Sequence, residues 1–492
     1  MISFIMGIVL LIAGYFTYGK VVERLIGPDD RVTPAYSKED GVDFIPMKTG
    51  TSFLIQLLNI AGLGPIFGAL SGALWGPVVY LWIVFGTIFA GGVHDYLSGM
   101  LSERNNGASI SEIVGKYLGP VMKTIMRIFS VVLLVMIGVV FMVGPAQLIA
   151  LLTPDAFGVQ FWTIVVLIYY FLATLLPIDK IIGKIYPIFG LALIVMALGI
   201  GGATLLHSGE RPMLEIWDHF ENMYPAKDKL PIWPLMFITV ACGAISGFHA
   251  TQSPMMARCL TKEKNGRKIF YGAMVAEGII ALIWASAGVA FYYNRGGDGT
   301  GLQALLDMQG GNSNTVYQMS RALLGGVGSI LAMIGVIACP ITSGDTAFRS
   351  ARLTIADWFK IDQQDKKKRL LLSLPLLLVG YGISKLNYAV IWRYFSWSNQ
   401  TLAMMVLWAI AVYLCRYRSK ISSWMASIPA TYMSAVTVAY ILQAKEGFRI
   451  NPTIADGIGI AFAAVVFAFY MIKVYTKAGD TPLVDTPLEV KK

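Results

Sequence analysis

Apolar segments of about twenty residues recur along nearly the whole 492-residue chain, and this pattern constrains the fold more than any other feature. A helix that crosses a bilayer needs roughly 20 mostly apolar residues. Hydrophobic residues make up 56% of the chain and charged residues only 14%, whereas a typical globular domain is about 25% charged. A soluble core cannot cover this much apolar surface, so the sequence predicts an all-α polytopic membrane protein.

Thirteen segments meet the length requirement for a membrane-spanning helix. They are residues 2–19, 51–72, 77–100, 124–151, 161–177, 183–206, 232–257, 270–293, 319–346, 370–386, 389–415, 424–443 and 455–475. The first segment lacks both a basic start and a small-residue cleavage site, so we interpret it as a retained helix rather than a signal peptide.

The basic residues predict how the chain is oriented. Alternate connecting segments hold 30 of the 39 Lys and Arg residues; these segments are 20–50, 101–127, 178–184, 258–268, 349–369, 416–420 and the tail from 473. Bacterial inner-membrane proteins keep basic residues in their cytoplasmic segments. We therefore expect a plasma-membrane protein with its N-terminus outside and its C-terminus in the cytoplasm. The net charge of +10 reflects this topology and contacts with lipid headgroups, and we expect no nucleic-acid partner.

A cluster of Gly and Pro residues interrupts the second expected span, at residues 59–66. Gly62 and Gly64 permit an unwound turn, and Pro65 suits the first turn of a new helix. Non-helical backbone at membrane depth persists only where protein or a water-filled cavity satisfies its polar groups. A helix start there would favour a carboxylate, and Asn59 adds an amide. The alternative is that the glycines only allow close packing.

The seventh expected span carries a second cluster, at residues 242–254. Its polar members are expensive at membrane depth, so function is the first hypothesis. The candidates for binding substrate there are Ser246, Gly247, His249, Thr251 and Gln252.

The two clusters lie five spans apart, so their segments cross the bilayer in opposite directions. Interrupted helices at corresponding positions of two halves predict an inverted repeat with a substrate site at the midplane. The expected organisation is an N-terminal helix and linker (1–50), a first repeat (51–206), an external loop (207–231), a second repeat (232–416) and two C-terminal helices with a tail (417–492).

A third cluster lies in the ninth span. Thr342 and Ser343 offer hydroxyl oxygens and Asp345 offers a carboxylate, which are ligands for Na⁺ or stations for a proton. The alternatives are that the hydroxyls bond to carbonyls of their own helix and that Asp345 pairs with Arg349 one turn later.

His94 and Asp95, near the inner end of the third span, form another candidate group. They are suited either to relaying protons or to a structural hydrogen bond. Together with His249 they could bind a metal, but nothing in the spacing requires it, so we expect neither a metal nor a cofactor beyond a coupling ion.

Polar residues also begin the eleventh span. Arg393 either attracts an anionic solute or belongs to an interfacial aromatic belt, and Asn399 and Gln400 are candidates for bonds between helices.

These motifs together resemble the carbon starvation protein A family. The segments that carry the resemblance are Gly64–Ala69, Leu74–Pro77, Gly92–Tyr96, Ser246–Pro254, Thr342–Arg349 and Ser398–Gln400. The resemblance implies the amino acid–polyamine–organocation superfamily, with a five-plus-five inverted-repeat (LeuT-like) core, one extra N-terminal helix and two extra C-terminal helices. It implies secondary active uptake of peptides or pyruvate during carbon starvation, and the motifs do not separate these substrates.

The resemblance also assigns roles to the clusters. It places substrate at Gly62–Ile66 and Ser246–Gln252 and a cation or proton near Thr342 and Ser343. We therefore predict a symporter driven by H⁺ or Na⁺, rather than an enzyme. The competing hypotheses are a channel and a metal-dependent intramembrane enzyme built on His94, Asp95 and His249.

Overall fold

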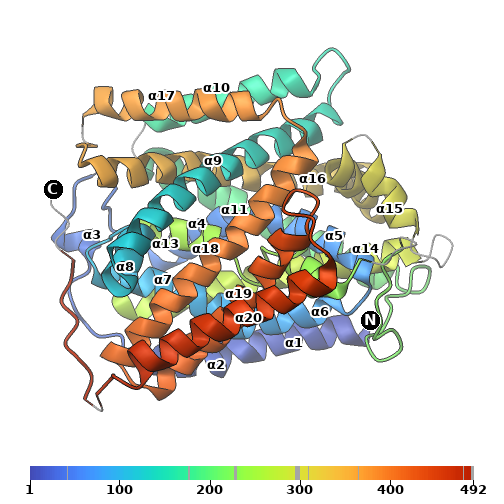
Figure 1. Cartoon of the computed structure of the whole chain (residues 1–492). Coiled ribbons are helices and arrows are strands. Elements are labelled where there is room, and N and C mark those ends of the chain that lie inside the picture. The colour runs from blue at the N-terminus through green and yellow to red at the C-terminus, as the bar shows by residue number, and fades with distance from the viewer. Residues whose placement is uncertain are drawn as a thin grey trace.

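The computed structural model describes residues 1–41, 43–175, 178–225, 230–293, 300–308, 310–363, 365–479 and 481–488. Helices run between two faces of one bundle (Figure 1). We call these the N-terminal face, which carries Met1, and the C-terminal face, which carries residues 481–488. The described residues form no β-sheet, and their one isolated bridge joins Met47 to Leu260.

The bundle is built from α-helices, several of which continue directly into π-helical segments. The α-helices are α1 (Ile2–Phe16), α2 (Tyr18–Ile26), α3 (Pro34–Ser37), α4 (Thr49–Ile60), α5 (Ala69–Gly72), α6 (Val79–Leu81), α7 (Gly92–Arg104), α8 (Ile110–Leu118), α9 (Pro120–Ala150), α10 (Val159–Leu175), α11 (Ile178–Leu206), α12 (Phe237–Thr239), α13 (Gly247–Ala257), α14 (Gly272–Tyr293), α15 (Thr300–Asp307), α16 (Gly311–Phe359), α17 (Lys366–Ile383), α18 (Tyr388–Tyr417), α19 (Trp424–Gln443) and α20 (Pro452–Tyr470). The π-helical segments are η1 (Gly64–Gly68), η3 (Trp82–Gly91), η4 (Ile232–Met236), η6 (Arg267–Tyr271) and η8 (Met471–Tyr475).

Within the described residues, 8 helical stretches are long and apolar enough to cross a membrane, and a bent pair, residues 49–60 with 64–75, raises this number to 9. Helices also form at four other expected spans, as α6–η3–α7, α10, α12 with α13, and α17. Residues 176 and 177 of the fifth expected span lie outside the described part of the chain. The prediction of an all-α multi-pass membrane protein is confirmed, whereas the count of thirteen spans is not.

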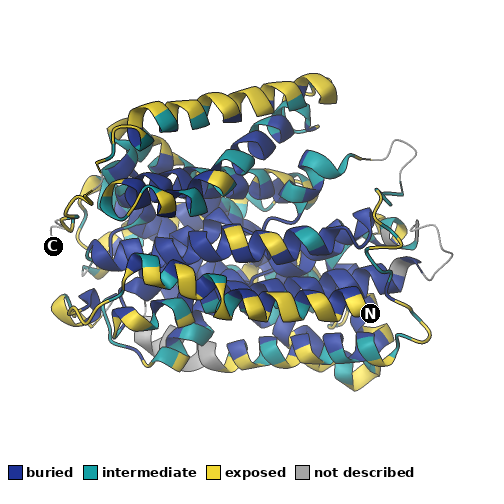
Figure 2. Cartoon of the chain, turned by 90° about the horizontal axis from the view of Figure 1, so that it is seen from below, coloured by how far each residue is buried: buried dark blue, intermediate teal, exposed yellow. Residues whose placement is uncertain are grey.

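The interior of the bundle includes α7 and α13, whose residues are all buried, and α14 and α18, which are almost wholly buried. Buried residues gather inside the bundle in Figure 2. In contrast, α1 and α20 lie at the periphery and expose large apolar side chains such as Val9 and Val465. Exposed apolar surface on this scale suits contact with lipid tails rather than water.

Two helices are interrupted where the sequence predicts. The first ends at Ile60, and a new helix begins at Gly64 with Pro65 in its first turn; the two parts bend by 52°. The second interruption is longer, because residues 240–246 are non-helical between α12 and α13. Within it Gly243 has φ +88, a left-handed conformation that favours glycine.

The third polar cluster does not interrupt its helix. α16 remains helical through residues 339–346 despite Pro340. Its non-helical residue is instead Gly325, with φ 68 and ψ −166, about four turns earlier.

Segments distant in the sequence meet at the C-terminal face. Arg104 bonds to Glu263 at 2.5 Å and to the Tyr413 hydroxyl at 3.1 Å. The C-terminal strap, which we define as residues 483–488, crosses this face: Asp485 pairs with Lys116 at 2.5 Å. The N–H of Leu483 bonds to the carbonyl of Arg416, and that of Leu488 bonds to the side chain of Asn105.

Candidate substrate and ion site

The two helix breaks lie directly against each other. A Cβ added to Gly64 would lie 2.3 Å from both Cβ and Sγ of Cys242, and one on Gly68 would lie 3.0 Å from the carbonyl oxygen of Thr239. A Cβ on Gly243 would meet Ala281 at 2.4 Å and Pro65 at 3.7 Å. The glycines of both clusters therefore allow close approach as well as unwinding. The first helix is broken as predicted, so the alternative that its glycines only allow close packing is wrong.

Side chains of α16 hold the carbonyl groups that the first break frees. The Ser343 hydroxyl donates to the carbonyl of Leu58 at 2.8 Å, and the Cys339 thiol donates to the carbonyl of Ala61 at 2.6 Å. Buried backbone carbonyls without a helical partner need such donors. The third polar cluster thus packs against the first break.

The second break is held by η3 and α18. The Trp82 indole donates to the carbonyl of Val240 at 3.0 Å, and the Thr87 hydroxyl donates to that of Gly243 at 2.8 Å. The Asn399 side chain accepts from the N–H of Phe248 at 2.6 Å and donates to the Ser246 hydroxyl at 2.9 Å. The prediction that Asn399 bonds between helices is confirmed.

The remaining predicted substrate residues divide into packing positions and polar groups. Gly62 and Gly247 are packing positions: an added Cβ would lie 2.5 Å from Phe141 and 2.4 Å from the carbonyl of Asn399, respectively. Asn59 is buried, and no described residue bonds to its side-chain amide.

At the other break, the Thr251 hydroxyl bonds to the carbonyl of Phe248 at 2.6 Å. The amide nitrogen of Gln252 reaches Thr251 and Ser350, whereas its oxygen has no donor among the described residues. The side chains of Asn59 and Gln252 thus retain unused hydrogen-bonding groups beside the breaks.

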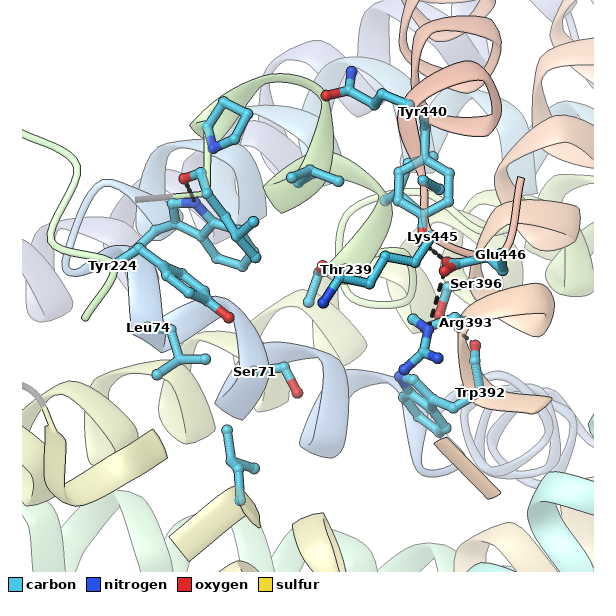
Figure 3. Close-up of a pocket in the computed structure, with 18 of the residues that line it drawn as sticks. Ser71, Leu74, Tyr224, Thr239, Trp392, Arg393, Ser396, Tyr440, Lys445 and Glu446 are labelled. Carbon is cyan, nitrogen blue, oxygen red and sulfur yellow. Dashed lines mark hydrogen bonds and ion pairs between the residues drawn. The ribbon is translucent and has the colours of Figure 1, made fainter. Parts of the chain in front are cut away.

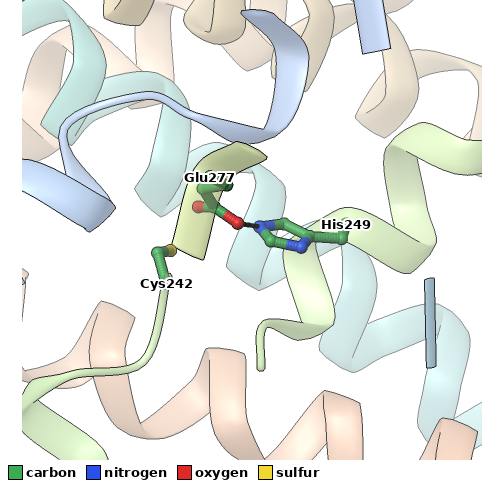
Figure 4. A group of neighbouring side chains, drawn as sticks. All are labelled: Cys242, His249 and Glu277. Atoms are coloured by element: carbon green, nitrogen blue, oxygen red, sulfur yellow. Dashed lines mark ion pairs between the residues drawn. The ribbon is translucent and has the colours of Figure 1, made fainter. Parts of the chain in front are cut away.

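A buried chain of His and acidic side chains lies next to the breaks. Asp95 bridges two histidines: one carboxylate oxygen lies 2.7 Å from Nδ1 of His94, and the other lies 2.8 Å from Nδ1 of His249. On the other side of that ring, Nε2 of His249 lies 3.4 Å from Glu277 (Figure 4). The structure thus brings together three residues that the sequence predicts, His94, Asp95 and His249, and adds Glu277 from α14.

The predicted cation residues lie in the interior of α16. The hydroxyl of Thr342 bonds to the carbonyl of Cys339 at 2.7 Å, and that of Ser343 bonds to the same carbonyl at 3.0 Å. Both back-bonds agree with the alternative interpretation of these residues. Ser343 in addition faces the first break, and Asp345 is buried nearby on the same helix.

A pocket of about 490 Å³ opens at the N-terminal face, and Figure 3 shows its lining. Its residues include Ser71, which follows the first break, and Thr239, which precedes the second. The Lys445 ammonium points into the pocket toward Thr239 (Figure 3). Arg393 also lines it and pairs with Glu446 at 3.1 Å.

Glu277 is the main residue that the sequence reasoning missed. An acidic residue within the apolar segment 270–293 is itself a signal, because an ionisable side chain at membrane depth is rarely retained without a role. The signal was weak because no other polar cluster surrounds Glu277 in the sequence. Its neighbours Cys242 and His249 come from the second break and from α13, respectively.

The helical fold, with two broken helices that adjoin in its interior, defines a multi-pass membrane protein as the class. The family model described as carbon starvation protein CstA matches residues 1–155 and 147–294. This chain belongs to the carbon starvation protein CstA family, as its motifs predict.

Several relatives support this assignment. An uncharacterized membrane protein of Haemophilus influenzae is 46% identical over 342 residues, covering 60% of this chain and 92% of that protein. The peptide transporter CstA of Escherichia coli is 23% identical, with 89% of this chain and 81% of that protein covered. The pyruvate/proton symporter BtsT of Escherichia coli is 27% identical over 63% of this chain and 52% of its own length. These two named relatives are transporters rather than enzymes, in agreement with the prediction that this chain is not an enzyme.

A solved structure has a similar fold. A mutant of the manganese transporter of Eremococcus coleocola aligns with a TM-score of 0.54, covering 86% of this chain and 94% of that chain. The two sequences are 14% identical. The similarity therefore concerns the arrangement of helices alone.

Proposed function

We propose that this chain is a secondary active transporter that imports pyruvate or another small carboxylate, or short peptides, in symport with H⁺ or Na⁺. The observation that carries the proposal is the meeting of two interrupted helices in the interior of the bundle, where Gly64 faces Cys242. Broken helices supply backbone groups and helix ends to a solute at membrane depth. The names of the relatives supply the two substrate classes.

The proposed core consists of two inverted repeats, 51–206 and 232–416, in the LeuT-like arrangement. The position of the breaks supports it, because they fall in the first helix of each proposed repeat. The substrate is proposed to bind between the breaks, beside Asn59 and Gln252, whose amide groups have unused hydrogen-bonding atoms. A polar ligand would satisfy these buried groups, which are otherwise costly to leave unpaired.

The pocket at the N-terminal face is proposed as the entrance. Arg393 and Lys445 contribute two positive charges to its wall and Glu446 contributes one negative charge. A cleft with excess positive charge raises the local concentration of anions. This favours the carboxylate over a zwitterionic peptide as cargo.

The coupling ion is proposed to act at the contact between α16 and the first break. Ser343 bonds there to the carbonyl of Leu58, and Thr342 and Asp345 lie on the same helix. Hydroxyl, carbonyl and carboxylate oxygens are suitable ligands for Na⁺. The alternative station is the pair His94 and Asp95, which would carry a proton.

Uptake into liposomes tests this proposal. The purified protein is reconstituted, and labelled pyruvate and a labelled tripeptide are supplied with an inward H⁺ gradient, an inward Na⁺ gradient or neither. We expect saturable accumulation of one solute that collapses when the driving gradient is dissipated. Accumulation that does not depend on either gradient would refute symport, and non-saturating flux with unitary currents would indicate a channel.

A charge variant tests the entrance. Arg393→Gln should raise the KM for pyruvate several-fold, because Glu446 then faces the pocket without its cation. Lys385→Gln is the matched control. Lys385 is another basic residue close to the N-terminal end of α18, but it bonds to Gln160 and does not line the pocket. An equal change of KM in both variants would show that Arg393 has no specific role at the entrance.

We also propose the orientation that the basic residues predict, with the N-terminal face outside the cell. Reporter domains that are active on only one side of the membrane, fused in the loop near residue 155 and after residue 418, test it. Opposite signals at these two sites, with the second cytoplasmic, are expected. Signals from the same side would refute this topology.

A further inference from the structure

The side chains of Cys242, His249 and Glu277 converge at the second helix break. Cys242 lies in the non-helical stretch, His249 in the first turn of α13 and Glu277 in α14. All three are buried, and their ligand atoms lie within 4.8 Å of one another. Figure 4 shows the Cys242 sulfur and the His249 ring both directed toward the Glu277 carboxylate. From this geometry we infer a binding site for one divalent transition-metal ion of the zinc type.

Unpaired acceptors in the cluster favour a cation. The Glu277 carboxylate faces the backbone of Gly243 and Nε2 of His249, the latter at 3.4 Å, and neither contact has the geometry of a normal hydrogen bond. Asp95 adds a second fully buried carboxylate on the far side of the His249 ring. Two buried carboxylates are costly without compensating charge. One divalent ion offsets the charge of these two carboxylates.

The His249 ring is hydrogen-bonded in the way that is typical of a metal-binding histidine. Asp95 lies 2.8 Å from Nδ1 of His249, so it accepts the ring N–H and leaves the lone pair of Nε2 directed toward Glu277. Histidines that bind metals usually donate their other N–H to a carboxylate or carbonyl in this way. Asp95 in turn contacts His94 through its other oxygen, which fixes the orientation of the carboxylate.

The ligand atoms determine the kind of ion. Sulfur, imidazole nitrogen and carboxylate oxygen together suit zinc and similar ions, whereas magnesium and calcium prefer oxygen alone. Tetrahedral ligands at zinc are separated by roughly 3.3–3.6 Å. The contact between His249 and Glu277 already has this length, at 3.4 Å. All the ligand atoms lie within 4.8 Å of one another, so side-chain movement alone closes the set, and three protein ligands leave a fourth position open.

Metal binding to the purified protein tests the inference. The whole chain in detergent is stripped with a chelator, incubated with Zn²⁺ and freed of excess ion before its metal content is measured. We expect one Zn²⁺ per chain. Cys242→Ser and Glu277→Gln should each lower the affinity at least tenfold, and Asp95→Asn by 10- to 100-fold. Cys415→Ser is the matched control, because Cys415 is also buried but lies outside the cluster.

Cobalt gives a second measurement that needs no variant. Co²⁺ bound by Cys242 should produce a thiolate-to-metal charge-transfer band in the near ultraviolet, which added Zn²⁺ removes. A wild-type protein that retains no Zn²⁺ and shows no such band overturns the inference, as does an equal loss of affinity in Cys415→Ser. In that case the cluster is an ion pair between a protonated His249 and its two carboxylates. Because these tests measure metal content and spectra, their outcome does not depend on whether the proposed cargo is transported.

Discussion

Substituting Gly64 by Ala should destabilise the protein through a clash between the two helix breaks. The new Cβ would lie 2.3 Å from Cβ and Sγ of Cys242, whereas carbon atoms at contact lie about 3.5–4.0 Å apart. An overlap of more than ~1 Å therefore has to be relieved. Neither segment has free space behind it, because Gly243 packs against Ala281 and Gly62 packs against Phe141.

The size of the effect follows from overpacking. Extra atoms in a close-packed core cost roughly 1–3 kcal/mol, so the ratio of folded to unfolded protein should fall by roughly 5- to 150-fold. Unfolding by sodium dodecyl sulfate in mixed micelles, followed by tryptophan fluorescence, measures the change. The control is Gly457→Ala in α20, where an added Cβ meets nothing within 4 Å. Its effect should be neutral or stabilising by up to about 1 kcal/mol, since Ala favours helix over Gly.

A compensating substitution identifies the cause. Cys242→Gly removes the atoms that the new Cβ would meet, so the double variant Gly64→Ala with Cys242→Gly should be more stable than the sum of the two single effects predicts. Residues in contact show interaction energies of about 0.5–3 kcal/mol, and we expect at least about 1 kcal/mol here. If the single effects add to within about 0.5 kcal/mol, the two breaks do not meet as described and the reasoning is refuted.

Three further predictions concern other contacts. Asn399→Ala should lower the unfolding free energy by about 2–4 kcal/mol, because a buried donor, the N–H of Phe248, and a buried acceptor, the Ser246 hydroxyl, lose their partner. Thr401→Val, which removes a hydroxyl bonded to its own helix, should change it by less than about 0.5 kcal/mol; similar losses in both variants would contradict the role of Asn399. Burial raises the pKa of Glu215, but hydrogen bonds from the N-terminal ammonium and Ser3 outweigh it and lower the pKa to about 2. The stability advantage of wild type over Glu215→Gln should therefore be complete above about pH 4.5 and shrink as the pH falls toward 2; a gap in melting temperature that is constant with pH would contradict this. Asp345→Asn should reduce gradient-driven uptake in liposomes at normal expression, and unchanged pH and Na⁺ dependence would exclude Asp345 from coupling.

Local chemistry explains why the breaks could be predicted from the sequence. Gly62, Gly64 and Pro65 are adjacent, and their backbone preferences act on neighbouring residues alone. The same holds for Gly243, whose left-handed conformation lies within the predicted second cluster. The third cluster resembles the first two in composition, yet α16 stays helical there. Its hydroxyls bond to the helix backbone instead, an outcome that composition alone does not distinguish.

The partners of the breaks could not be predicted, because they come from distant helices. Asn399 lies about 150 positions after Ser246, and Ser343 lies about 285 positions after Leu58. A single sequence offers no means to pair them. The number of crossings was uncertain for a different reason. The second break divides its span, and α13 has only 11 residues, which is shorter than an ordinary membrane-spanning helix.

The strap at the C-terminal face ties three separate parts of the bundle with one short stretch of chain. Its bonds to Asn105, Lys116 and Arg416 reach the end of α7, α8 and the end of α18. These helices cannot move apart at that end unless the bonds between the strap and at least one of them break. Separation of these three helices at the C-terminal face is consequently coupled to the detachment of a surface peptide.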